Sequence, residues 1–436
     1  MKWVCVVVVA ALLQACGGGD DADTAAATDQ SCSIDSQRQS LGTFMQAKYY
    51  WYRDMPAPDE SAATMDGYFQ SMLYRPPDRY SYTQPTAAFD QVFTQGRRIG
   101  YGYTLVWGDA SQSTLRVRNV EPLSPVAAAG LRRGDTIIAI DSYSPSDIAQ
   151  GLLPAVTTAG VPRTFVVLAA GAIRQITVDS ADFPLQQVAA TNIFDAQGSA
   201  GPEKVAYLAY NQFVSYSEPD VDTAFAQFAA AGVSDIILDL RYNGGGSIAV
   251  SRDLASLVGG AKMLGKVFAE LRFNDQQSAS DEDMLFMPQQ ATDGTPLRDG
   301  VPRVFVLTSG GTASASELLI NGLRAYMPVV LVGETTYGKP YGFIPRDACG
   351  INYEAVQFES FNGLGAGEFT SGIQPDCQVA DDLDHQLGDP QEASIRTALN
   401  YVTTGNCGAA VTRQIVRQVP ATAPIGETVP PGMFVD

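Results

Sequence analysis

The chain has 436 residues, 45% of them hydrophobic and 17% charged, which is the composition of a globular protein long enough for two or three domains. Its formal net charge is −19, because 47 acidic residues outnumber 28 basic ones. Since a surface of this sign repels phosphate backbones and anionic lipids, the charge argues against a nucleic-acid partner.

The first fifteen residues have the pattern of an export signal. Lys2 supplies a basic start, and the apolar run from Val4 to Leu13 is too short to span a membrane. The run ends in Leu13-Gln14-Ala15-Cys16 followed by glycine, which resembles the lipobox of bacterial lipoproteins. The resemblance implies that residues 1–15 are removed, that Cys16 receives a lipid, and that the protein is held at the outer membrane, facing the periplasm. A plain signal peptide with an incidental cysteine is the alternative.

Four cysteines remain for an oxidising compartment once Cys5 leaves with the leader and Cys16 is lipidated. Four cysteines allow three pairings. We favour Cys349 with Cys377, and Cys32 with Cys407, since the second bond would join the start of the folded region to its end. Unpaired buried thiols are the alternative, and metal binding is disfavoured because the sequence has no Cys-x-x-Cys pair and no histidine cluster.

The next two segments differ in composition. Residues 16–31 are rich in Gly, Asp, Ala and Thr and predict a flexible tether. Residues 32–96 carry aromatic and apolar side chains at helical spacing, with breaks at Pro56-Ala57-Pro58 and Pro76-Pro77. They predict a small N-terminal helical domain.

From residue 97 to 184 the pattern changes to short strands, predicted at 101–107, 114–120, 136–140, 164–168 and 174–178, with helical pieces at 125–131 and 146–153. The run Ala129-Gly130-Leu131-Arg132-Arg133-Gly134-Asp135 before a strand closely resembles the PDZ domains of bacterial exported proteases. Such domains bind a peptide as an added strand and capture its terminal carboxylate with backbone amides. The resemblance places that loop at Ile99, Gly100, Tyr101 and Gly102, for which a simple tight turn is the alternative.

After residue 184 strands and helices alternate. Strands are predicted at 204–209, 234–240, 304–308 and 329–332, and helices at 219–231, 248–258 and 315–326. This order favours an α/β core over residues 185–408 with a largely covered sheet. The proline-containing end, residues 409–436, has little apolar periodicity and predicts a poorly ordered tail.

Two residues of this core have the types needed for nucleophilic catalysis. Ser314 precedes a predicted helix, and Lys339 follows Gly338 in a later loop. A serine attacks a carbonyl only if a base takes its proton, and burial can lower the pKa of a lysine enough for it to do so. A Ser/His/Asp triad would depend on the single histidine, His385, which we interpret as a solvated loop residue among aspartates.

Backbone N–H groups near Ser314 could stabilise an oxyanion. They would come from the helix N-terminus and from Gly244-Gly245-Gly246, where glycine permits close approach to a substrate. Each feature alone is weak, because a serine before a helix is most often a cap and a lysine after a glycine is most often on the surface.

In combination the motifs are specific. The segments 239–246, 312–317 and 332–339, in that order behind a PDZ-like region, resemble the carboxyl-terminal processing, or tail-specific, peptidases, and the resemblance covers roughly residues 98–400. It implies a multidomain protein with a ClpP/crotonase-like α/β core. It also implies Ser314 as nucleophile, Lys339 as general base, and the amides of Gly245, Gly246 and Ala315 as candidate oxyanion donors. No phosphate-binding loop or metal-ligand cluster is visible, so no cofactor is implied.

One position departs from the family. Its members often have a glutamine four residues after the lysine, where this chain has Phe343, and Glu317, Thr336 and Tyr341 are possible substitutes for orienting Lys339. We therefore expect a serine endopeptidase that recognises the C-terminal ends of exported proteins through its PDZ domain, and that dimerises if its N-terminal helices act as in some relatives. The alternatives are a catalytically weak membrane-tethered peptide-binding protein, and a hydrolase of non-peptide esters or amides.

Overall fold

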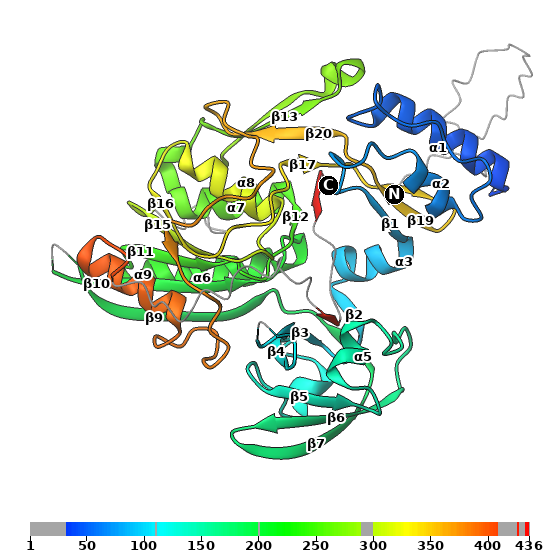
Figure 1. Ribbon diagram of the computed structural model, residues 1–436. Helices are drawn as coiled ribbons and strands as arrows, with labels where there is room; N and C mark the ends of the chain where they lie inside the picture. The colour runs from blue at the N-terminus through cyan, green and yellow to red at the C-terminus, as the bar shows by residue number, and fades with distance from the viewer. Residues whose placement is uncertain are drawn as a thin grey trace, which may run out of the picture.

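The computed structural model describes residues 32–109, 111–198, 201–288, 300–408, 425–426 and 432–435. The predicted leader, the tether and Cys16 lie outside them. Figure 1 shows an α/β body, a β-rich domain that projects from it, and a group of N-terminal helices at its side. Within these ranges no helix has the length and apolar character needed to cross a bilayer.

The N-terminal region contains two α-helices of more than one turn, α1 (Ile34–Lys48) and α2 (Met65–Ser71), followed by α3 (Thr86–Phe89) and the π-helical turn η1 (Asp90–Thr94). Between them, β1 (Tyr82–Pro85) pairs antiparallel with β19 (Ile351–Glu354), which also pairs with β18 (Arg346–Ala348). The buried side chains of α1 and α2 share one cluster with Tyr353 and Val356. The helical region predicted here therefore has no core separate from that of the later chain.

The β-rich domain contains a six-stranded sheet in the order β22-β3-β4-β5-β6-β7, and the segments on either side of it, β2 and β8, form a separate two-stranded sheet. The strands predicted in this segment are present, and the two predicted helices are shorter than expected. Their bounds are β2 (Arg97–Gly100), β3 (Tyr103–Trp107), β4 (Leu115–Val120), α4 (Pro125–Ala128), β5 (Thr136–Ile140), α5 (Pro145–Ala149), β6 (Pro162–Ala169), β7 (Ala172–Asp179), β8 (Ala181–Pro184) and β22 (Ile425–Gly426).

The α/β body is built on a sheet in the order β21-β16-β15-β11-β10-β9, parallel except for the edge strand β9. The strands are β9 (Val188–Gly198), β10 (Gly201–Tyr210), β11 (Asp235–Asp239), β15 (Val304–Thr308), β16 (Val329–Gly333) and β21 (Cys377–Gln378). The helices are α6 (Glu218–Ala231), α7 (Ile248–Gly259), α8 (Ala315–Arg324) and α9 (Ala393–Thr404). The strands and helices predicted for the core are confirmed.

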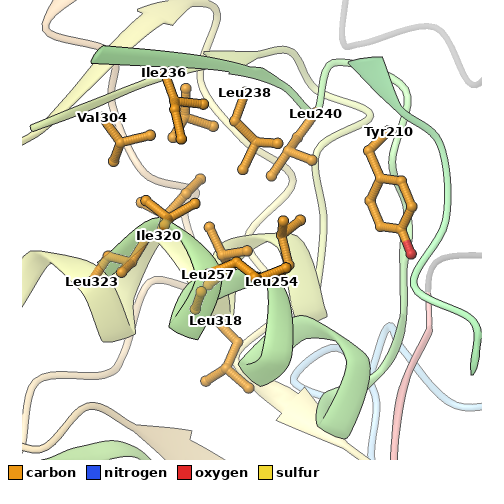
Figure 2. Packing of buried hydrophobic residues seen from close by; sticks show 14 of the residues in the cluster. Tyr210, Ile236, Leu238, Leu240, Leu254, Leu257, Val304, Leu318, Ile320 and Leu323 are labelled. Carbon is orange, nitrogen blue, oxygen red and sulfur yellow. The ribbon is translucent and has the colours of Figure 1, made fainter. Parts of the chain in front are cut away.

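Both faces of this sheet are covered, which explains the nearly continuous apolar strands. On one face, Ile236, Leu238 and Val304 point toward leucines of α7 and α8, as Figure 2 shows. On the other face, Ile237 and Phe305 pack with Ile395 of α9. The two layers of helices fix the ends of β11 and β15, where the candidate site residues follow.

A second sheet, in the order β14-β13-β20-β17, lies beside α8. It comprises β13 (Val267–Phe273), β14 (Glu282–Leu285), β17 (Tyr341–Gly342) and β20 (Phe358–Phe361). Two short strands, β12 (Gly245–Ser247) and β23 (Gly432–Phe434), pair with each other. Single turns of 3-10 helix occur at η2 (Ser215–Ser217), η3 (Gly260–Met263) and η4 (Asp275–Ser280).

The disulfide pairing predicted from the sequence is wrong. The bonds join Cys32 to Cys349 and Cys377 to Cys407, with Cα separations of 5.7 and 5.5 Å. Cys32 lies just before α1, which packs near the β18–β19 turn that holds Cys349. Cys377 lies in β21 at the sheet edge, next to the end of α9 and Cys407. A disulfide requires close Cα atoms, which the sequence order of the cysteines does not reveal.

The prediction of a poorly ordered tail is also wrong for part of that segment. Residues 425–426 and 432–434 are strands that pair with β3 and β12. Their backbone groups pair with strands elsewhere in the molecule. This pairing orders residues whose own apolar periodicity is too weak to predict a strand. The rest of residues 409–436, apart from Val435, lies outside the described residues.

Candidate active site

The loop between β15 and α8 carries Ser314 and is tied to the segment that follows β11. The Thr312 hydroxyl donates to the Leu240 carbonyl over 2.8 Å, and the Ser316 hydroxyl donates to the Asn243 carbonyl over 3.0 Å. Because the two segments follow neighbouring parallel strands, both leave the sheet at the same edge. Ser314 and the glycines after Asn243 are thereby brought to one place.

Ser314 has an unusual backbone conformation at the start of α8. Its φ of 63° and ψ of −118° lie outside the regions that residues other than glycine ordinarily occupy. Such a conformation costs about 1–3 kcal/mol and persists only where the surroundings enforce it. The Ser314 side chain is fully buried, and within the described residues its hydroxyl has no hydrogen-bond partner. The geometry presents a hydroxyl that is not committed to a capping bond.

Glu317 joins the serine segment to the lysine segment. Its buried carboxylate accepts the backbone N–H groups of Ser314 and Lys339 on the same oxygen, each over 2.8 Å. The other oxygen accepts the Gly338 N–H over 2.7 Å and the Thr336 hydroxyl. Burial raises the pKa of the Glu317 carboxyl, and these donors oppose the rise. One side chain therefore holds the two candidate catalytic segments against each other.

Lys339 is 1% exposed, and its environment favours the neutral amine. Burial lowers the pKa of Lys339 to about 8, although the charges of Glu354, Asp78 and Glu317 oppose the shift. Its Nζ lies 4.6 Å from the ring centroid of Phe343 and 6.0 Å from that of Tyr82. Phe343, which stands where family members often have a glutamine, is therefore the side chain over which the Lys339 nitrogen lies.

Thr336 and Tyr341, the other two residues considered for orienting Lys339, have different surroundings. The Thr336 hydroxyl donates to the Glu317 carboxylate, which also accepts the Lys339 backbone N–H. Tyr341 packs with the N-terminal region, its ring centroid 4.8 Å from that of Trp51. Of the three substitutes proposed from the sequence, Glu317 makes the direct contact, and it does so with the lysine backbone.

Glu354 is a site residue that the sequence did not indicate. It lies on β19, is fully buried, and has a pKa raised to about 8 by burial, with the charge of Lys339 acting in the opposite direction. No motif surrounds Glu354, and the only signal in the sequence was a carboxylate inside an otherwise apolar strand pattern.

The three candidate oxyanion donors are not equivalent. The Gly245 N–H already donates to Asn243 Oδ1 over 2.9 Å, so it would have to exchange partners to bind a substrate oxygen. Gly246 has a φ of 131°, and a Cβ there would lie 2.1 Å from the Phe213 carbonyl oxygen, so only glycine fits. Ala315 is the first residue of α8, where the amide has no acceptor within its own helix. Gly246 and Ala315 are the better candidates.

A buried ionic network supports the segment between β11 and β12. Arg241 is 1% exposed and pairs with Asp239, Glu392 and Asp381 at 2.6, 2.8 and 3.1 Å. Although burial opposes the charge, Asp239 and Glu392 raise the pKa of Arg241 well above its usual range. Arg133 of the β-rich domain pairs with the same Asp381 over 2.7 Å. The network links that domain to the strand end that leads to the glycines.

The candidate carboxylate-binding loop, Ile99 to Gly102, connects β2 to β3 and lies away from Ser314 in sequence and domain. Gly102 has a φ of 86°, and a Cβ there would lie 2.1 Å from that of Ser124, so the loop packs closely on the start of α4. The adjoining strand β3 pairs with β22 on one edge and β4 on the other.

Neither His385 nor a metal cluster adds to this site. His385 Nδ1 lies 2.8 Å from Asp382 Oδ2, and its side chain is 36% exposed, in agreement with a loop position. Over the described ranges no group of three or more His, Cys, Asp or Glu side chains is arranged to hold a metal ion.

Comparison with known proteins shows which family part of this chain resembles. Residues 204–379 match the model of peptidase family S41. The chain is 29% identical to a carboxyl-terminal-processing protease of Synechocystis over 80% of this chain and 77% of that protein. It is 25% identical to a chloroplastic C-terminal processing peptidase of Tetradesmus obliquus over 66% of this chain, and spans 61% of that relative's length.

The solved structures include a close match in fold. The crystal structure of a protein described as an S41 protease from Bacteroides fragilis superposes with a TM-score of 0.66 and 25% identity, over 83% of this chain and 96% of that one. The shared architecture is the multidomain α/β fold of S41 peptidases. Residues 204–379 are therefore similar to the serine-type peptidase domain of family S41, and the relatives of this chain are carboxyl-terminal processing proteases.

Proposed function

We propose that this chain is an endopeptidase in which Ser314 is the nucleophile and Lys339 is its general base. One observation carries the proposal: a single oxygen of the buried Glu317 carboxylate accepts the backbone N–H groups of both residues. A serine with an uncommitted hydroxyl and a lysine with a lowered pKa are the two components that such chemistry needs.

The chemistry follows from these groups. Lys339, as the neutral amine, takes the proton of the Ser314 hydroxyl while the serine oxygen bonds to the substrate carbonyl carbon. The carbonyl electron pair moves to oxygen, where the amides of Gly246 and Ala315 would stabilise the negative charge. As the intermediate collapses, the C–N bond breaks and the lysine proton passes to the leaving amine. Water then hydrolyses the ester, with Lys339 taking and returning a proton in the same way.

Substrate capture is assigned to the β-rich domain. We propose that it acts as a PDZ domain whose loop from Ile99 to Gly102 receives the carboxyl end of an exported protein, while the edge of β3 pairs with the preceding residues. The support is the strand order and the fact that the β3 edge already accepts a strand, β22.

We also propose a lipid anchor on Cys16 that holds the enzyme at the outer membrane, facing the periplasm. The support is the sequence around Cys16 together with two disulfides, which persist in an oxidising compartment. Metabolic labelling with palmitate tests the anchor, since a Cys16→Ala variant should lose the label and leave the membrane fraction.

Cleavage of casein by the chain from residue 17 to 436 tests the proposed activity. Wild-type protein should degrade casein, and Ser314→Ala and Lys339→Ala should not. If the wild-type chain is also inactive when peptides occupy the β3 edge, Phe343 in place of the family glutamine would favour the alternative, a peptide-binding protein with an unreactive site.

A further inference from the structure

The last described strand of the chain lies inside the candidate active site. On one side, β23 pairs in parallel with β12, so that Gly432, Met433 and Phe434 are opposite Gly245, Gly246 and Ser247. On the other side, Phe434 pairs with Phe343, and the Val435 N–H donates to the Phe343 carbonyl over 3.3 Å. In Figure 1, β23 is the red strand next to the label C, close to β12 and β17.

The Phe434 side chain fills an aromatic pocket. It is 6% exposed and belongs to a buried cluster with Phe93, Val214 and Phe343. Its ring centroid lies 5.2 Å from that of Phe93 in an edge-to-face arrangement, and 5.7 Å from that of Phe89. We name these residues, Phe89, Phe93, Val214 and Phe343, the aromatic pocket.

Three elements next to the proposed catalytic residues border this strand. β12 contains Gly246, a candidate oxyanion donor, and Phe343 is the ring over which the Lys339 nitrogen lies. β23 also contacts α8, the helix that begins directly after Ser314. A substrate strand that pairs with β12 at Gly246 would lie where β23 now lies.

The same segment of chain meets the β-rich domain. Ile425 and Gly426 pair antiparallel with Leu105 and Thr104, so β22 runs toward the loop that precedes β3. This is the direction in which a PDZ ligand would run. Residues 425–426 thus occupy the β3 edge that the proposed function assigns to a substrate, and residues 432–434 occupy the β12 edge that contains Gly246.

We propose that residues 432–435 occupy the position of the substrate strand, with Phe434 in the aromatic pocket, so that this segment competes with substrate. The aromatic pocket then selects substrates that have a large apolar side chain at the position that Phe434 occupies in the strand. The inference rests on the proposed function for its consequence, inhibition, but strand binding itself does not require catalysis.

Covalent attachment makes such competition effective. A segment joined to its own binding site acts at an effective concentration in the millimolar range when the connection can span the distance. A free peptide at micromolar concentration would bind only to the small fraction of molecules whose tail has left. Occupation by the tail therefore predicts weak binding of peptide to the full chain and strong binding once Phe434 is removed.

Fluorescence anisotropy of a labelled peptide tests the inference. The probe is Thr-Val-Pro-Pro-Gly-Met-Phe-Val-Asp, the sequence of residues 428–436. Three proteins are compared, all carrying Ser314→Ala so that neither probe nor tail is cut: residues 17–436, the same chain ending at 431, and the full chain with Phe434→Asp. We expect the probe to bind at least tenfold more tightly to the last two than to the first.

A second probe with alanine in place of phenylalanine tests the pocket, and it should bind at least tenfold more weakly. Equal affinity of the first probe for all three proteins, including no binding to any, would overturn occupation by the tail. Equal affinity of the two probes would overturn the role of the pocket. Because binding is measured on an inactive variant, failure of the proposed peptidase activity would not alter either result, and circular dichroism confirms that each protein is folded.

Discussion

Lys339 and Arg241 are both buried cations, each 1% exposed, yet their surroundings have opposite effects on them. Arg241 is paired with three carboxylates, and although burial opposes its charge, Asp239 and Glu392 raise its pKa well above its usual range. Lys339 lies over the ring of Phe343, and burial lowers its pKa to about 8 despite acidic residues nearby. Burial alone therefore does not decide whether a cation is structural or reactive.

The difference lies in what replaces water. Close carboxylates compensate a charge for lost hydration, whereas aromatic rings compensate it only in part. With a pKa near 8, roughly a tenth of the Lys339 side chains are neutral at pH 7, which is enough for a general base. The arginine network holds the segment before the glycines, whereas the environment of Lys339 suits the general base of the proposed function.

The largest effect is expected from Lys339→Arg. Arginine keeps the positive charge but cannot give up its proton in a protein, so it cannot accept one from Ser314. We expect kcat to fall by at least about 10³-fold, as it should for Lys339→Ala. Casein or peptide cleavage measures this. Substantial activity in Lys339→Arg would mean that the amine is not the base.

The second prediction concerns Arg241→Met, which should destabilise the fold. It leaves Asp239 and Glu392 buried without their cation, which typically costs about 3–5 kcal/mol. Urea unfolding followed by circular dichroism measures the loss. Lys339→Met serves as the matched control. It should change the free energy of unfolding by no more than about 1 kcal/mol, because its loss leaves less buried carboxylate charge without a partner than the loss of Arg241 does. Similar losses in both would remove the distinction.

The pH dependence of kcat/KM should have an acid limb with a midpoint near 8, because only the neutral amine of Lys339 acts as a base. The negative charge of Glu354 raises the pKa of Lys339. Glu354→Gln removes that charge, so the limb should move to lower pH. Glu282→Gln, which removes an exposed carboxylate of β14, is the control and should leave the midpoint in place. A move to higher pH in Glu354→Gln would contradict the assignment.

The smallest effect is expected from Phe343→Leu. A ring face near an ammonium stabilises the charged form by about 0.5–2 kcal/mol, so removal of the ring should lower the pKa of Lys339 and shift the acid limb to lower pH by roughly 0.4–1.5 units. Phe89→Leu is the control, because Phe89 also contacts Phe434 but no contact between it and Lys339 is recorded among the described residues. Equal shifts in the two variants would point to loss of the pocket rather than of the ring face.

The sequence predicted those parts of the molecule in which local pattern and tertiary structure agree. The strands that precede Ser314 and Gly245 are apolar and bounded by glycines, so their order could be derived before any coordinates. Ser314 and Lys339 were found because their motifs are contiguous. What the structure adds is that Glu317, a residue of the serine motif, binds the backbone of the lysine motif.

The remaining features depend on contacts between distant segments. Glu354 enters the site through the pairing of β19 with β1, which no local pattern reveals. Phe434 belongs to a segment whose composition favours disorder, and it becomes ordered only through pairing with β12 and Phe343. The cysteine pairing likewise follows from the packing of α1 and α9 and not from sequence order.

The bond between Cys32 and Cys349 spans 317 residues, and both Ser314 and Lys339 lie inside the covalent ring it closes. A single backbone cut anywhere between these cysteines would leave the two pieces joined. An enzyme that shares its compartment with other proteases could thus be nicked in an exposed turn and still keep its serine and its lysine in one molecule. On an electrophoresis gel, such a nick would appear only after reduction.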